Sequence, residues 1–117
     1  MEKMNVKIDR LSNIMLGEIS KILENEINDS DIKFVTLTSC KITNDLSFAK
    51  VYFTTLGDRD KTLEALNGAS GYIRSLVAKN MIIRKMPVLI FEYDESIEYG
   101  QKIDDIIERI NEDGGSN

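Results

Sequence analysis

Apolar positions in the first part of the chain recur every three or four residues, the spacing of one face of a helix. Charged side chains such as Lys7, Arg10 and Glu18 fill the positions between them, and turn-forming residues follow at 28–31. This pattern predicts an amphipathic helix over 6–28. Its apolar positions are Ile8, Leu11, Met15, Ile19, Ile22 and Leu23.

Two segments rich in β-branched residues, 34–43 and 46–56, follow on either side of a short Asn-Asp-Leu turn. They predict an antiparallel hairpin. The second segment alternates regularly, so one of its faces is apolar. The apolar face carries Ala49, Val51 and Phe53, and the opposite face carries Lys50, Tyr52 and Thr54.

The first of these strands changes parity along its length. Val35 and Leu37 have one parity, whereas Cys40 and Ile42 have the other. A β-bulge inserts one extra residue and so shifts the alternation. We therefore predict a bulge near Ser39, which would place all four side chains on one face. Cys40 is interpreted as a small buried hydrophobe.

The rest of the chain predicts three more helices and one strand. Helical spacing runs over 59–67 and 70–80, with a bend where glycines fall. Proline opens a strand at 87–93, and an isoleucine-rich segment at 96–112 predicts a last helix. The order is α-β-β-α-α-β plus a C-terminal helix. The fold class is α+β, a three-stranded sheet covered by helices on one face, in a single domain over 1–111 with a flexible tail at 112–117.

Composition narrows the classes of function. The chain has 117 residues, no histidine and one cysteine, so triads with histidine, Cys/His zinc sites and iron–sulfur clusters are excluded. No apolar run approaches the ~20 residues that span a bilayer. We expect a cytoplasmic protein that is not an enzyme and uses no cofactor, metal, membrane or small-molecule substrate.

Charge is distributed unevenly. Residues 1–91 hold 13 Lys and Arg against 11 Asp and Glu, whereas residues 92–117 hold 2 against 9. The stretch 65–91 carries four cations and no acid. A local field of this kind attracts a polyanion even when the net charge is −5. On charge alone, an ordinary solvated surface is an equal alternative.

Two glycines lie at the predicted bend, although glycine in a helix interior costs roughly 1 kcal/mol relative to alanine. Residues 68–71 read Gly-Ala-Ser-Gly, which satisfies the GXXG pattern of KH domains, where a loop between two helices clamps the RNA backbone. Glycine allows a nucleotide backbone to approach closely, and a helix that starts there offers free N–H groups. The alternative is that Gly71 only lets the two helices pack.

Longer segments carry a family resemblance. They read "VTLTSCKITNDLSFAKVYF", "GASGYIRSLVAKNMIIRKMPVLIFEYD" and "SIEYGQKID". In order and spacing they resemble the ribosome-binding factor A family, whose members have a type-II KH fold. The resemblance implies that the working element is the Ala69-Ser70-Gly71 kink. It also implies binding to the free immature 30S subunit and its 16S rRNA, support for late maturation and rRNA 5′-end processing, and importance in the cold.

The predicted RNA-binding residues are Ala69, Ser70, Gly71, Arg74, Lys79, Arg84, Lys85 and Lys50. We expect the protein to act as a monomer. One alternative is a protein-interaction adaptor that works through the acidic C-terminal helix and a sheet edge; deletion of 96–117 separates the two readings. A hydrolase built on Asp58 and Asp60 is disfavoured, because nothing in the sequence places them in a pocket.

Overall fold

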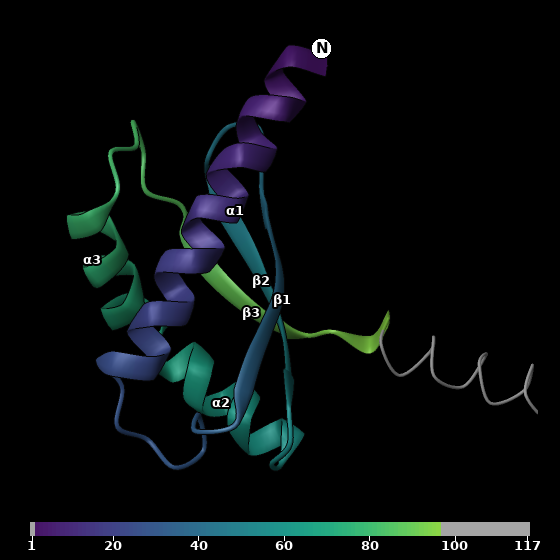
Figure 1. The fold of residues 1–117 in the computed structure, drawn as a ribbon, viewed down its shortest axis with the longest axis vertical. Coiled ribbons are helices and arrows are strands. Elements are labelled where there is room, and N and C mark those ends of the chain that lie inside the picture. Colours follow the sequence, from purple (N-terminus) through teal and green to yellow (C-terminus); the bar gives the residue numbers. More distant parts are fainter. Residues whose placement is uncertain (1, 97–117) are drawn as a thin grey trace, which may run out of the picture.

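The computed structural model describes residues 2–96, with side chains from residue 7 onward. Within this range the elements follow the predicted order α-β-β-α-α-β (Figure 1). They are α1 Glu2–Asn25, β1 Val35–Ile42, β2 Phe48–Thr55, α2 Arg59–Gly68, α3 Ser70–Asn80 and β3 Val88–Tyr93. The predicted C-terminal helix and tail lie outside the described residues.

The sheet has the strand order β1-β2-β3. β1 and β2 are antiparallel, whereas β2 and β3 are parallel, so the α2–α3 pair forms the crossover between them. The register of β1 against β2 shifts between Leu37 and Ser39. This confirms the predicted bulge, and the shift turns Cys40 and Ile42 into the core. Burial raises the pKa of the Cys40 thiol to about 11, because the buried thiolate loses its hydration.

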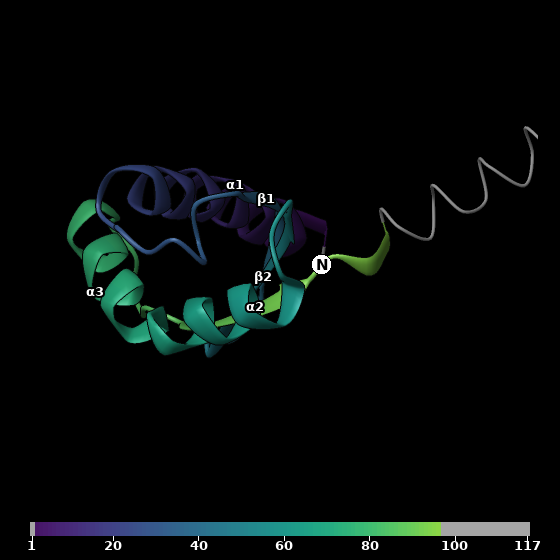
Figure 2. The same ribbon diagram turned by 90° about the horizontal axis from the view of Figure 1, so that it is seen from below.

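The three helices cover one face of the sheet, as predicted. Figure 2 shows α1 at one side and α2 at the other, with α3 between them. The side chains that alternate inward from β2 and β3 meet the apolar stripes of the helices in one continuous cluster. Its fully buried members include Met15, Ile19, Ala49, Val51, Phe53, Leu66, Ile73, Val77 and Phe91.

The first helix differs from its predicted bounds. It begins at Glu2 and ends at Asn25, before the predicted end at 28. The apolar positions continue to Ile27, which packs against the core, but an aspartate turn follows the helix: the Asp29 carboxylate accepts from the N–H of Asp31 at 2.9 Å. Such turns compete with the helix for backbone donors. Within residues 2–96, no helix is both long and apolar enough to cross a membrane.

Candidate nucleic-acid interface

A single residue, Ala69, separates α2 from α3. Its backbone has φ −94° and ψ 0°. Its N–H donates to the carbonyl of Ala65 at 3.0 Å, and its own carbonyl accepts from the N–H of Ile73 at 2.9 Å. The helical hydrogen bonding therefore resumes almost at once, while the helix axis changes direction (Figure 1). The predicted bend between two short helices is confirmed.

The two glycines beside this bend have no close neighbours. A Cβ atom placed on Gly68 or on Gly71 meets no heavy atom within 4 Å, and neither residue has a positive φ. Packing among the described residues therefore gives no reason for glycine here. Gly17 on α1 is equally open, so what sets the two glycines apart is their place at the bend.

The start of α3 is uncapped. No side chain accepts a hydrogen bond at its N-cap, and its first turn holds no acidic residue. The Ser70 hydroxyl donates to the carbonyl of Asn67 at 2.9 Å, so it serves the end of α2 rather than the start of α3. The first N–H groups of a helix have no partner within the helix, and they form the positive end of its dipole.

Two side chains tie the bend to the outer edge of β3. The Asn67 carboxamide oxygen accepts from the N–H of Phe91 at 3.1 Å, and its amide group lies 3.5 Å from the carbonyl of Phe91. The Arg74 guanidinium donates to the carbonyls of Met86 and Pro87 at 2.7 and 3.0 Å. Asn67 and Arg74 therefore hold the bend in place. The sequence analysis missed the contact of Asn67, because neither pattern nor charge signals a side chain that binds a strand edge.

The predicted cations do not all gather at the bend. Arg84 and Lys85 are exposed in the loop between α3 and β3. Because α3 has 11 residues and a helix rises about 1.5 Å per residue, this loop lies roughly 16 Å from the bend. Lys79, in the last turn of α3, is exposed near the same end. The structure thus forms a strip along α3, with glycines at one end and cations at the other.

The cationic loop contacts the β1–β2 turn. The Lys85 ammonium lies 3.3 Å from the hydroxyl of Ser47. In that turn, the Asp45 carboxylate accepts from the N–H of Ser47 and the hydroxyl of Thr43, which lowers the pKa of Asp45. Arg84 and Lys7 help to line a shallow groove of about 330 Å³ between this turn and α1. Lys7 therefore joins the cations at this end, which helical spacing alone did not reveal.

Lys50 lies apart from the other predicted residues. It is exposed on β2, and its ammonium is 3.7 Å from the carboxylate of Glu92 on β3. On the same open face, the Lys41 ammonium stands 6.0 Å from the ring centre of Tyr52. The structure therefore places Lys50 on the uncovered face of the sheet rather than beside the bend.

One flank of the bend is acidic. Gly68 and Ala69 adjoin a hollow of about 730 Å³ that Asp29, Asp31 and Glu64 also line. Phosphates would be repelled on this flank. Lys61 is the one cation among the residues that line this hollow, and Gly71 does not line it, so the side of Gly71 and α3 is the more favourable approach for an anionic ligand.

The fold and this strip define a small α+β binding domain whose exposed element is a bent pair of helices. The chain belongs to the ribosome-binding factor A family, whose model matches residues 7–107. A ribosome-binding factor A from Staphylococcus epidermidis is 44% identical over 109 residues, covering 91% of this chain and 94% of the relative. One from Pelobacter propionicus is 47% identical over 110 residues, covering 92% and 90%.

Solved structures agree with this fold. The crystal structure of ribosome-binding factor A from Thermus thermophilus has a TM-score of 0.70 at 19% identity, covering 74% of this chain and 93% of that chain. A model of the Thermus thermophilus factor, as fitted into the cryo-EM map of a complex with the 30S subunit, has a TM-score of 0.65 at 18% identity, covering 75% and 96%. The likeness extends to the arrangement of sheet and helices.

Proposed function

We propose that this chain binds the free immature 30S subunit through its 16S rRNA, as a monomer in the cytoplasm, without catalysing a reaction itself. In this role it supports late maturation and processing of the rRNA 5′ end, and it matters most in the cold. The relatives' name and the complex of the Thermus thermophilus factor with the 30S subunit support the choice of partner. The open backbone at Gly71, which lies outside the acidic hollow, is the observation that carries it.

The interface we propose runs along α3. The RNA backbone passes over Ser70 and Gly71, where no Cβ stands in its way and the helix start offers N–H donors. Lys79, Arg84 and Lys85 then neutralise phosphates further along. Arg74 keeps N–H groups beyond those that bind the two carbonyls, so it joins the interface from a fixed position. Lys50 would contact RNA only where the strand wraps onto the open sheet face.

A double charge reversal tests this interface. We expect Lys79→Glu with Arg84→Glu to weaken binding to purified 30S subunits about tenfold or more, and to lower the slope of log K against log salt by roughly 1.4–1.8. Both side chains are exposed, and a circular dichroism spectrum of the variant checks that it is folded. Co-sedimentation over a salt series measures both quantities. Unchanged co-sedimentation would remove the strip along α3 from the proposal.

The matched control carries the same change in charge elsewhere. Lys33→Glu with Lys61→Glu alters two exposed lysines at the acidic end of the molecule, and we expect less than about a twofold effect there. The same two double variants also test whether the strip along α3 is needed for rRNA maturation in cells. In a strain that lacks the chromosomal copy, the first pair should fail to restore mature 16S 5′ ends at low temperature, whereas the control pair should restore them. Equal restoration by both pairs would contradict the link between this strip and maturation.

A further inference from the structure

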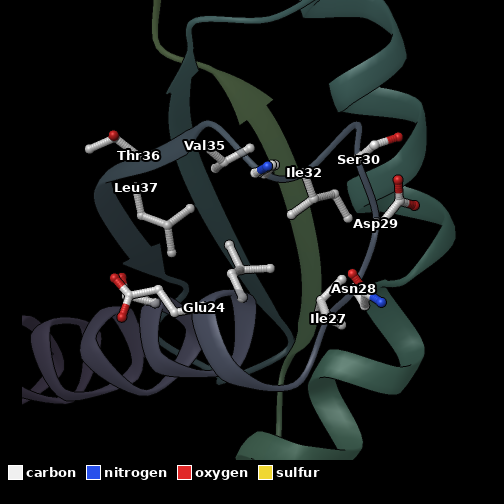
Figure 3. Close-up of a pocket in the computed structure, with 12 residues that line it drawn as sticks. Glu24, Ile27, Asn28, Asp29, Ser30, Ile32, Val35, Thr36 and Leu37 are labelled. Atoms are coloured by element: carbon white, nitrogen blue, oxygen red, sulfur yellow. The ribbon is translucent and has the colours of Figure 1, made fainter.

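A second groove lies along the other edge of the sheet, and Asp29 lines both this groove and the hollow beside Gly68 and Ala69. The groove lies between the end of α1, the 26–34 loop and the first residues of β1, and has a volume of about 610 Å³. Figure 3 shows Ile32, Val35 and Leu37 around this space, with Glu24 at its α1 rim. Leu23 and Ile27 complete an apolar floor. We call it the β1-edge groove.

The backbone of β1 faces this groove with free polar groups. The carbonyl of Phe34 accepts from the N–H of Leu56, so Phe34 faces the β2 side. Residues of an antiparallel strand alternate in this respect, so Val35 and Leu37 face away from β2. The N–H of Val35 indeed bonds to the carbonyl of Ile32, at 3.3 Å. Leu37 therefore presents both its N–H and its carbonyl at the groove.

Side chains cover the edge backbone at two other points of the sheet. On β3, the Asn67 side chain lies on both polar groups of Phe91. Further along β1, the hydroxyl of Ser12 accepts from the N–H of Ile42 at 3.3 Å. Exposed strand edges pair readily with other chains, and proteins usually cover them. The segment from Val35 to Leu37 is thus an edge left available beside an apolar floor.

The charged residues around the β1-edge groove indicate which kind of ligand it would bind. Two acidic side chains, Glu24 and Asp29, line the groove together with one cation, and Glu26 and Asp31 lie close by in the sequence. The cation of the groove, Lys33, stands 5.8 Å from the ring centre of Phe34. Nucleic acid is therefore repelled here, whereas a basic segment is attracted.

We propose that the β1-edge groove binds an extended, lysine- or arginine-rich protein segment, which adds a strand to β1 at Leu37 and places aliphatic side chains on the floor between Leu23 and Ile32. Backbone hydrogen bonds supply affinity in this mode, and alternate side chains supply specificity. The inference adds a protein partner to a molecule whose proposed RNA surface lies elsewhere. Either site can fail without the other.

The probe is a labelled peptide, Lys-Lys-Val-Thr-Val-Thr-Val-Lys-Lys, titrated with the full chain and followed by fluorescence anisotropy. Two versions carry N-methyl groups, one on the valine amides and the other on the threonine amides. When a peptide adds as a strand, only the N–H groups of every second peptide residue point toward β1. One version should therefore lose about tenfold in affinity, the size of two hydrogen bonds, while the other binds as before. Equal behaviour of the two would overturn strand addition.

Substitutions locate the site. Glu24→Lys at the groove rim should weaken the peptide about fivefold, since it reverses a charge close to the bound lysines. Glu64→Lys, an exposed carboxylate on α2 outside the groove, is the matched control and should change little. Equal weakening by both variants would mean diffuse attraction and would contradict the groove. Competition by a short single-stranded RNA, or no binding of the peptide at all, would also overturn the proposal.

Discussion

Two polar side chains decide where the bend of α2 and α3 sits. Asn67 binds the backbone of Phe91, and Arg74 binds the carbonyls that precede β3. Hydrogen bonds that involve a charged group contribute more than neutral ones. Arg74 therefore combines two roles, since it holds the loop before β3 and also lies within the proposed interface. Its removal cannot be read as a loss of phosphate contact alone.

The double role of Arg74 leads to a stability prediction. We expect Arg74→Ala to lower the free energy of unfolding by about 1–2 kcal/mol, because the carbonyls of Met86 and Pro87 lose their donor. Arg74→Lys keeps the charge but lacks the fork that reaches both carbonyls, so it should recover only part of this loss. Urea unfolding followed by circular dichroism measures the effect. Lys79→Ala, with an exposed side chain, serves as the control and should stay within about 0.5 kcal/mol; an equal loss there would contradict the anchoring role.

At the scale of elements, patterns within short stretches of sequence predicted the features that neighbouring residues determine. The parity change between Leu37 and Cys40 predicted the bulge, and helical spacing interrupted by glycine predicted the bend. The start of α3 was also predictable, since it is set by residues next to one another. The end of α1 was placed too late, because the apolar spacing continues to Ile27 while the Asp29 turn competes for the backbone donors after Asn25.

Contacts between distant segments could not be predicted in this way. The pairing of Asn67 with Phe91 and the contact of Lys85 with Ser47 depend on how the sheet edge and the loops meet, whereas the alternation of β2 already predicted Lys50 on the open face of the sheet. The stretch 65–91 has no acidic residue. In the structure its glycines lie at the bend where α3 starts, whereas Lys79, Arg84 and Lys85 lie at or beyond the end of α3. The acidic flank of the bend comes from the 26–34 loop, which lies far away along the chain.

The glycines of the bend allow stability and binding to be separated. We expect Gly71→Ala to raise the free energy of unfolding by about 0.5–1 kcal/mol, since its Cβ meets nothing within 4 Å. The same methyl group stands where the RNA backbone would pass, so 30S affinity should fall about tenfold, or about 1.4 kcal/mol. Gly17→Ala on α1, which is equally open, should stabilise without loss of affinity. Full 30S affinity of Gly71→Ala would contradict close approach at the bend.

Charged side chains are distributed unevenly over the described part of the molecule. The 26–34 loop and the start of α2 bring carboxylates to one end, whereas the loop before β3 brings Arg84 and Lys85 to the other (Figure 1). Although the net charge is −5, the described residues have a local positive end at the loop before β3, and a local field of this kind attracts a polyanion. The acidic groove and the basic strip face different partners, which fits a protein that meets RNA and basic protein segments together.

Removal of residues 97–117 tests this polarity and also the adaptor alternative. The cut leaves Ser96, whose N–H and hydroxyl bind the carboxylate of Asp94 and lower its pKa. It removes six acids and two bases, so the net charge changes from −5 to −1. If the strip along α3 binds rRNA, the shortened chain should keep its 30S affinity or gain some at low salt, because long-range repulsion is reduced. A shortened chain that keeps its circular dichroism spectrum and thermal transition but loses the subunit would favour an adaptor that acts through its acidic C-terminal segment.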